Sequence, residues 1–262
     1  MRSDAPRFDT VEVEVQGSVG RLRLNRPATR NALNLQLTQD IIGAVRWFND
    51  QRHVKAVVIS GNGKGFCSGF DLTNFSPDAA PEDIRGIVAL GEELARTVLR
   101  MRPISIAAVH GHCVGGGVVL AGACDFRYAS EDASFMLPET ALGIPLAWSG
   151  VPLLTRELGP LMTTEFVLLC EFMPARRALE LGMLNDVVPG DALEARWQRT
   201  ADVIAQRSHL VLEMTKQQMV AARDSLVSSA HAFADAHLLY SGLRDEDSRR
   251  SQKDYMERLR KP

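Results

Sequence analysis

Two glycine-rich segments have the composition expected of loops that hold a developing negative charge. The first covers residues 61–71 and reads Gly-Asn-Gly-Lys-Gly-Phe-Cys-Ser-Gly-Phe-Asp, and the second covers residues 109–125 and contains the triplet Gly115-Gly116-Gly117. Each follows a short apolar run that is typical of a buried strand. Because glycine has no Cβ, backbone N–H groups in such loops approach a ligand closely. Two of these loops side by side would form an oxyanion hole.

The triplet Gly115-Gly116-Gly117 is also expected to begin a helix that continues to Cys124. The N–H groups of a first helical turn have no partner within the helix, and the positive end of the helix dipole lies there. Both would face the loop and favour an anion. The pattern Gly-x-x-x-x-Gly-Lys-Ser/Thr is absent, so the glycines do not indicate a nucleotide phosphate loop.

Composition and charge exclude several classes of function. The 262 residues carry 30 basic and 32 acidic side chains, and this net charge of −2 favours neither nucleic acid nor a membrane surface as a partner. No apolar run approaches the roughly 20 residues of a membrane span, and the N-terminal segment has no export signal. The cysteines lack the paired spacing of a zinc site, which predicts reduced thiols in a cytoplasmic protein without a bound metal: Cys67, Cys113, Cys124 and Cys170.

Strands and helices that alternate along the first half of the chain must bring the two loops together. The expected elements are a hairpin (10–15 and 19–24), a helix from Leu35 to about Asn49 capped by Asn34, a strand (54–60), a surface loop (75–81), a helix (82–100) and strands (104–109, 126–129 and 134–136). After residue 149 the pattern is helical, with breaks at Gly159-Pro160, Pro174 and Pro189-Gly190, and residues 192–261 are expected to form three helices. This order predicts an α/β fold with a helical C-terminal extension.

Several short motifs, in this order and at this spacing, carry a family likeness. They are Leu24-Asn25-Arg26-Pro27 with Asn31-Ala32-Leu33-Asn34, Gly65-Phe66-Cys67-Ser68-Gly69-Phe70-Asp71-Leu72, Gly115-Gly116-Gly117, Cys124-Asp125, Pro138-Glu139, Leu142-Gly143-Ile144, Gln252-Lys253-Asp254 and Arg260-Lys261-Pro262. With these motifs the chain resembles the crotonase superfamily, the enoyl-CoA hydratase/isomerase family, over essentially its whole length.

The resemblance implies an α/β fold built as a spiral of ββα units. Residues 1–190 would form the spiral core with an acyl-CoA site, and residues 191–262 a helical region that assembles a homotrimer or a dimer of trimers. The ligand would be an acyl thioester of coenzyme A, so coenzyme A would be part of the substrate and no other cofactor would be needed. Two backbone N–H groups, of Phe70 and Gly116, would hold the thioester oxygen.

One departure from the family pattern decides the expected reaction. Hydratases of the family carry two glutamates, and the corresponding positions here are Val119 and Glu139. Adding water to a double bond needs one carboxylate to activate the water and a second to supply a proton. Moving a double bond from position 3 to position 2 needs one acid/base, and a glutamate with a valine is similar to Δ3-Δ2-enoyl-CoA isomerases. Glu139 is therefore the expected general acid/base, with a pKa raised by apolar neighbours.

The resemblance also suggests residues that bind the rest of the substrate. Trp148 and Leu146 would either crowd the acyl end or line a long apolar tunnel, and Arg26, Arg30 or Lys253 would reach the coenzyme A phosphates. The full set of expected binding residues is Arg26, Arg30, Ser68, Asp71, Leu72, Val119, Leu142, Leu146, Trp148 and Lys253.

Alternative interpretations of the same residues stay open at this point. The chain could hydrate enoyl-CoA, or hydrolyse the thioester, since Pro138-Glu139-Thr140 also resembles a hydrolase motif. It could instead bind fatty acyl-CoA without catalysis, because the second carboxylate is missing. Glu139 could also be no more than a carboxylate that stabilises a helix N-terminus.

Overall fold

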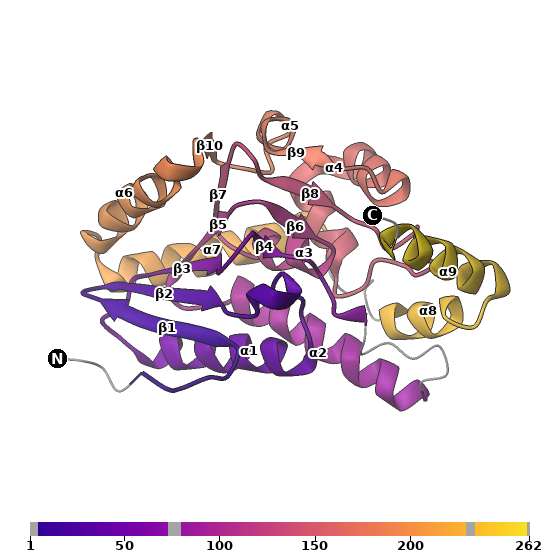
Figure 1. Cartoon of the computed structure of the whole chain (residues 1–262). Coiled ribbons are helices and arrows are strands. Elements are labelled where there is room, and N and C mark those ends of the chain that lie inside the picture. The colour runs from indigo at the N-terminus through magenta and orange to yellow at the C-terminus, as the bar shows by residue number, and fades with distance from the viewer. Residues whose placement is uncertain (1–4, 73–79, 229–233, 261–262) are drawn as a thin grey trace.

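A mixed six-stranded sheet forms one layer of the computed structural model, which describes residues 5–72, 80–228 and 234–260 (Figure 1). In sheet order its strands are β1 (Val11–Gln16), β2 (Val19–Leu24), β3 (Ala56–Gly61), β5 (Ile104–Val109), β7 (Phe126–Ser130) and β10 (Asp186–Val188). The predicted hairpin forms the antiparallel pair β1–β2, and all further neighbours pair in parallel. The carboxyl ends of β3, β5 and β7 therefore meet at one edge.

A second sheet lies at that edge and contains strands that the sequence patterns did not predict. Its order is β4 (Gly65–Cys67), β6 (His112–Val114), β8 (Ser134–Met136) and β9 (Met173–Pro174). The segments of β4 and β6 were predicted as glycine loops. Glycines in and beside these strands allow the two backbones to approach closely, because a side chain would clash there. A Cβ on Gly111 would lie 2.2 Å from the carbonyl oxygen of Lys64, and one on Gly65 would lie 2.8 Å from the His112 nitrogen.

The chain repeats one unit three times, and each unit adds a strand to both sheets and then a helix. The units are β3-β4-α2 (Pro81–Leu99), β5-β6-α3 (Gly116–Gly122) and β7-β8-α4 (Gly150–Leu169). The predicted spiral of ββα units is thus confirmed. The spiral stacks β4, β6 and β8 side by side, so the loops that leave them also lie side by side.

Helices cover both faces of the six-stranded sheet. On one face α1 (Leu35–Asp50) packs with α2, and its first turn is capped as predicted, since Asn34 Oδ1 accepts from Leu37 N at 2.8 Å. On the other face α6 (Leu193–Ala205) packs its Trp197 against alternate residues of β3, β5 and β7. Alternating strand residues are therefore buried on either face, which accounts for the nearly continuous apolar runs of β3 and β5.

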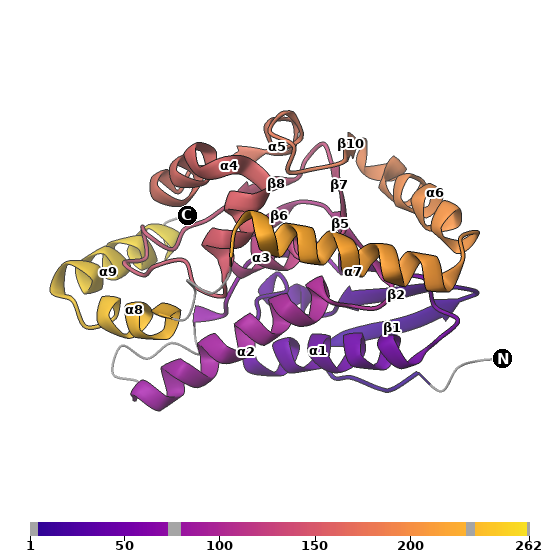
Figure 2. The ribbon, with the colours of Figure 1, turned by 180° about the vertical axis from the view of Figure 1, so that it is seen from behind.

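The C-terminal third contains four helices in its described part rather than the expected three. They are α6, α7 (His209–Leu226), α8 (Asp235–Gly242) and α9 (Glu246–Arg260), and α7 crosses the back of the molecule (Figure 2). Helices α8 and α9 are separate because Asp245 accepts a hydrogen bond from Ser248 N at 2.9 Å, so it caps a new first turn. The predicted division of the chain at residue 190 stays a prediction.

The remaining predicted breaks have different outcomes. Gly159 has φ 75° and ψ 164°, so the predicted break at Gly159-Pro160 divides α4 into two helical stretches that meet at a kink. Pro174 ends a strand, and α5 (Ala175–Glu180) follows. Short 3-10 turns cover Pro27–Thr29 and Gly190–Ala192. In the predicted surface loop, residues 75–79 lie outside the described residues and Pro81 begins α2. Within the described part of the chain, no helix is both long and apolar enough to cross a bilayer.

Candidate active site

Two cavities meet at Glu139. The inner cavity has a volume of about 50 Å³ and the outer one about 240 Å³, and Phe70, Glu139 and Ile144 line both. The other residues of the inner cavity are Ile87, Gly116, Val119, Pro145, Leu146, Ala147, Trp148 and Leu239. Those of the outer cavity are Arg30, Ser68, Gly69, Leu72, His112, Val114, Gly115, Met136, Pro138, Leu142, Phe172 and Tyr255.

The backbone around Phe70 is oriented by a single β-bridge to Leu33. Leu33 N donates to the carbonyl of Gly69 at 2.8 Å, and Asp71 N donates to the carbonyl of Leu33 at 3.0 Å. Because N–H and C=O groups of successive residues in an extended chain point to opposite sides, the N–H of Phe70 points away from Leu33. The predicted first donor thus has an orientation fixed by hydrogen bonds on both sides.

The predicted second donor is the N–H of Gly116. Gly116 is the first residue of α3, where N–H groups have no acceptor within the helix. Gly115 precedes it with φ 51° and ψ −120°, a conformation that L side chains rarely adopt, and its N–H donates to the carbonyl of Met136 at 2.8 Å. Gly115 therefore turns the chain sharply and sets the direction in which α3 begins.

The Glu139 side chain is placed directly against this turn. A Cβ on Gly115 would lie 2.8 Å from Glu139 Oε1, so the carboxyl group occupies the space that the glycine leaves open. Part of the residue is accessible, but Oε2 is buried and has no hydrogen-bond partner among the described residues. Desolvation by this burial raises the pKa of Glu139 from 4.5 to about 7, against a smaller opposing effect of its own backbone N–H.

A helix-terminal role for Glu139 is wrong. The residue lies in a turn, in which Ile144 N donates to the carbonyl of Glu139 at 3.0 Å, and the next helix begins only at Gly150. Thr140 anchors the turn through its Oγ1, which donates to the carbonyl of Val167 at 3.0 Å. A buried carboxyl group without a partner is costly unless it stays neutral or meets a ligand, so its position indicates a functional group.

The pH dependence of the reaction should report the raised pKa of Glu139. A general base must be ionised, and with a pKa of about 7 the ionised fraction rises about a hundredfold between pH 5 and pH 8. At the ordinary value of 4.5 it would change less than twofold over the same interval. We expect kcat/KM to rise with pH, to reach half of its maximum near pH 7 and to level off above about pH 8. A profile flat from pH 5 to pH 8 would contradict this role.

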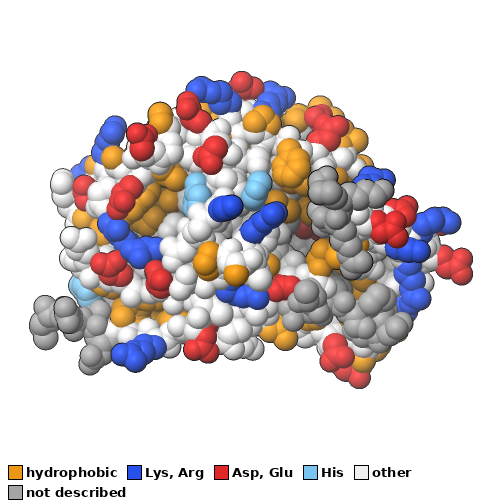
Figure 3. Space-filling view, in the orientation of Figure 1, with side chains coloured by type: hydrophobic (Ala, Val, Ile, Leu, Met, Phe, Trp, Pro, Cys, Tyr) orange, Lys and Arg blue, Asp and Glu red, His pale blue; other side chains and the backbone are white. Residues whose placement is uncertain are grey.

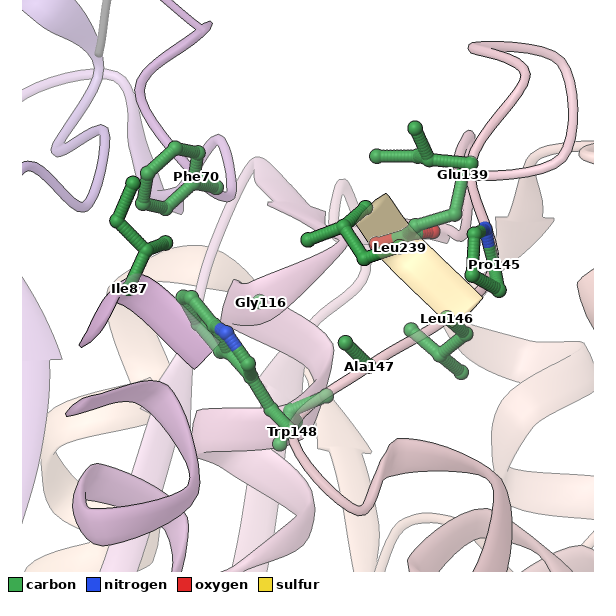
Figure 4. A pocket seen from close by; sticks show the side chains of 11 residues that line it. Phe70, Ile87, Gly116, Glu139, Pro145, Leu146, Ala147, Trp148 and Leu239 are labelled. Carbon is green, nitrogen blue, oxygen red and sulfur yellow. The ribbon is translucent and has the colours of Figure 1, made fainter. Parts of the chain in front are cut away.

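Apolar side chains line the inner cavity around the carboxyl group. Val119 of α3 and Leu146 line it as predicted, and Trp148 forms one of its walls. Figure 4 shows Glu139, Pro145 and Leu146 on one side of the cavity and Phe70 and Ile87 on the other. A second carboxyl group does not line this cavity among the described residues, so Glu139 is its titratable acid.

The outer cavity is larger, and its lining includes Arg30, Ser68, His112 and Tyr255. Four predicted binding residues line it, namely Arg30, Ser68, Leu72 and Leu142. On the face shown in Figure 3, Lys, Arg and His side chains gather near the middle, beside apolar surface. Such a mixture of cationic and apolar groups fits a long ligand that carries phosphates.

Three predicted binding residues do not line either cavity. Arg26 and Asp71 form an ion pair at 3.1 Å, and the Arg26 guanidinium also donates to the carbonyl of Ala32. This pair ties the segment before Leu33 to the residue after Phe70, so it supports the first oxyanion donor. Lys253 is exposed on α9. Contact of Arg26, Asp71 or Lys253 with coenzyme A stays a prediction.

Tyr255 of α9 is a cavity residue that the sequence analysis missed. Helix α9 packs on the turn that carries Glu139, because a Cβ on Gly143 would lie 2.3 Å from the carbonyl oxygen of Ser248. Tyr255 lies two turns further along the same face of α9 and reaches the outer cavity. Burial, and then the nearby Cys170 and Glu139, raise the pKa of the Tyr255 phenol. Only the tertiary packing of α9 brings this residue to the site.

Other lining residues were also missed for the same reason. Ile87 and Leu239 come from α2 and α8, and His112, interpreted as structural, lines the outer cavity with Phe172. Cys67 and Cys113 are buried core residues, as expected, and Cys124 is buried as well. Desolvation raises the pKa of Cys67 and of Cys124 to about 12. No cluster of three or more His, Cys, Asp or Glu side chains suited to a metal ion occurs among residues 5–72, 80–228 and 234–260.

Comparison with known proteins agrees with the observed fold. The sequence profile of the family described as enoyl-CoA hydratase/isomerase matches residues 14–262. The chain belongs to the enoyl-CoA hydratase/isomerase family. The predicted superfamily is therefore confirmed.

Individual members of the enoyl-CoA hydratase/isomerase family resemble the chain over most of its length. A probable enoyl-CoA hydratase of Mycobacterium bovis is 31% identical over 255 residues, which are 96% of each chain. The mitochondrial Delta(3,5)-Delta(2,4)-dienoyl-CoA isomerase of Rattus norvegicus is 29% identical over 237 residues, 85% of this chain and 72% of the relative. The crystal structure of an enoyl-CoA hydratase/isomerase from Xanthobacter autotrophicus Py2 superposes with a TM-score of 0.87 at 31% identity, covering 96% and 94% of the two chains.

Proposed function

We propose that this enzyme moves the double bond of a 3-enoyl-CoA thioester to position 2. The observation that carries the proposal is the arrangement of one buried carboxyl group, Glu139, in an apolar cavity that Gly116 and Phe70 also line. Relatives named as hydratases are more common than relatives named as isomerases. The preference for isomerisation therefore rests on this chain's own residues.

The reaction needs one proton to leave and one to return. The ionised carboxylate of Glu139 takes a proton from C2, and the electron pair moves onto the thioester oxygen to give a dienolate. The N–H groups of Phe70 and Gly116 stabilise that negative charge, and one such donor is worth about 2.7–4 kcal/mol in a transition state. The protonated Glu139 then delivers its proton to C4, the double bond forms between C2 and C3, and the carboxylate is regenerated.

Val119 argues against hydration. Adding water requires a polar group that holds and activates the water molecule next to the acid. Val119 is 1% exposed in the inner cavity and offers neither a donor nor an acceptor there. The apolar side chains around Glu139 also favour transfer of its proton within the substrate over exchange with water.

The outer cavity would hold the coenzyme A part of the substrate, and no separate cofactor is required. Arg30, Ser68 and His112 supply polar groups at its wall, and Phe172 and Leu142 supply apolar surface. Arg30 and His112 are exposed, so phosphate groups near them stay hydrated. We place the pantetheine chain in this cavity and the phosphates at its rim.

Product analysis tests the proposed function. The protein is incubated with 3-enoyl-CoA and, separately, with 2-enoyl-CoA, and the products are separated by mass and retention time. We expect a product of unchanged mass from 3-enoyl-CoA. A gain of the mass of water would instead establish hydration, release of free coenzyme A would establish thioester hydrolysis, and tight binding without any turnover would establish a binding protein.

Self-association into a trimer or a dimer of trimers is part of the same proposal. Large apolar side chains are exposed on two helices: Leu161, Leu168 and Leu169 on α4, and Leu210, Val211, Met214 and Met219 on α7. Exposed apolar surface of this extent favours burial against another protein surface. Light scattering of the intact protein checks the assembly, and a mass of 28.8 kDa, that of a single chain, would exclude it.

A further inference from the structure

Trp148 fills the space beside the predicted oxyanion donors. Its indole lies where two glycines leave room: a Cβ on Gly91 would lie 2.0 Å from Cε2, and a Cβ on Gly116 would lie 2.4 Å from Cζ3. The Phe70 ring meets the indole edge-on, with the ring centroids 5.8 Å apart and an interplanar angle of 84°. The residue is buried, with 7% of its surface exposed. The indole is therefore packed on three sides.

The backbone holds this indole in place as well. Trp148 and Ser149 have φ 62° and φ 56°, so two consecutive residues adopt the left-handed conformation that side chains rarely take. Ser149 N donates to Asp235 Oδ2 at 3.0 Å, which fixes the turn to α8. Gly91 lies inside α2, where glycine weakens a helix, and contact with the indole accounts for its presence. The left-handed turn and the two glycines, Gly91 and Gly116, thus together make room for the Trp148 indole.

The consequence is a short acyl pocket. The inner cavity of about 50 Å³ lies between Glu139, Phe70 and Trp148, as Figure 4 shows. Because a cavity needs roughly 10–15 Å³ to hold one water-sized group, the inner cavity has room for about four such groups. A chain of twelve carbons has about three times as many groups as this volume holds. The inner cavity is therefore not the long apolar tunnel that the sequence left open as an alternative.

We propose that Trp148 sets the substrate class by ending the acyl pocket, so that the enzyme acts on thioesters with acyl groups of about four to six carbons. This inference rests on the proposed function, since it assumes that the acyl group enters the inner cavity and coenzyme A the outer one. The lining agrees with that direction: the inner cavity is apolar apart from Glu139, whereas Arg30, Ser68, His112 and Tyr255 line the outer one.

Binding of saturated acyl-CoA thioesters tests the inference without any turnover. Calorimetry is performed with butanoyl-, hexanoyl-, octanoyl- and dodecanoyl-CoA. Each methylene buried in an apolar pocket strengthens binding about fourfold. We expect the wild-type affinity to rise up to hexanoyl-CoA and then to fall at least tenfold by dodecanoyl-CoA. With Trp148→Ala the affinity should keep rising to octanoyl- and dodecanoyl-CoA, and Trp148→Phe should lie between the two.

Trp197→Ala is the matched control variant. Trp197 is as buried as Trp148, with 6% of its surface exposed, but it belongs to the small core cluster beneath α6 and lines neither cavity. Its loss should lower the melting temperature and leave the dependence on chain length unchanged. A wild-type affinity that keeps rising to dodecanoyl-CoA, or a Trp148→Ala profile that matches the wild type, would overturn the inference.

The two proposals fail in different ways. If short thioesters bind tightly and 3-enoyl-CoA is not isomerised, the reaction assignment is lost and the acyl limit stands. If 3-enoyl-CoA of every chain length is isomerised at similar kcat/KM, the acyl limit is lost and the reaction assignment stands.

Discussion

Glu139→Gln is expected to lower the rate of double-bond isomerisation by about 10²–10⁴-fold, the usual contribution of a positioned acid/base group. Glutamine has the same size and a polar end, but it neither accepts the C2 proton nor returns one to C4. Because the carboxyl group lies against Gly115 and not at a charged partner, the change should leave substrate binding nearly intact. Steady-state kinetics with 3-enoyl-CoA should therefore show the loss in kcat, with KM little changed.

An exposed carboxylate provides the kinetic control. Glu131 pairs with Arg176 at 2.6 Å on the surface, with 47% of its side chain exposed, and lines neither cavity. Glu131→Gln should leave kcat and KM unchanged. If Glu139→Gln turns over as fast as the wild type, Glu139 is not the acid/base.

The same substitution should stabilise the folded protein above neutral pH. The folded state holds the Glu139 proton more tightly than the unfolded chain, because its pKa is about 7 instead of 4.5. Stability from this group is therefore complete below pH 4.5 and lost as pH rises through about 7. At about 1.4 kcal/mol per pKa unit the loss is on the order of 3 kcal/mol. Denaturant unfolding at pH 8 should accordingly favour Glu139→Gln, with little difference at pH 4.5.

Gly115→Ala is expected to damage both the fold and the reaction. Its φ of 51° with ψ −120° is unfavourable for any residue with a Cβ, at a cost of about 1–3 kcal/mol in the free energy of unfolding. The added methyl would also lie 2.8 Å from Glu139 Oε1, so the carboxyl group must move. A misplacement of about 1 Å in an active site costs around a hundredfold in rate. Chemical denaturation and kcat measured on one preparation would show both losses.

Gly182→Ala separates backbone strain from the effect on the site. Gly182 has φ 79° just after α5, and a Cβ there would meet nothing within 4 Å. This variant should lose stability from its backbone conformation and keep the wild-type kcat. Equal kcat values for Gly115→Ala and Gly182→Ala would show that Gly115 has no positioning role toward Glu139.

Periodicity and capping in the sequence determined much of the scaffold. Alternating and continuous apolar runs gave β2, β5 and β8 with their observed bounds, and Asn34 caps α1 as expected. These features can be predicted from the sequence, because hydrophobic periodicity, helix capping and turn formation depend on residues only a few positions apart. The same local signals misplaced β4 and β6, since the need for glycine between closely packed strands is visible only when the two strands are side by side.

The residue types around the reacting centre were also readable from the chain. Phe70, Gly116, Val119 and Glu139 line one cavity, as their motifs predicted. The motifs do not reveal the environment of Glu139. Desolvation raises the pKa of Glu139, and the burial that causes it depends on every residue that packs around the carboxyl group. The sequence therefore named the proposed acid/base, and the tertiary structure set its proton affinity.

The position of Trp148 was decided by tertiary structure alone. The sequence left Trp148 either as a barrier or as a tunnel wall, because a side chain's direction depends on the turn that carries it and on the surfaces that receive it. Gly91 is 57 positions away in the chain, and the two residues with left-handed backbone, Trp148 and Ser149, are not glycines. Contacts between such distant residues form only when α2, α3 and the turn after Glu139 pack together. That packing fixes the size of the pocket.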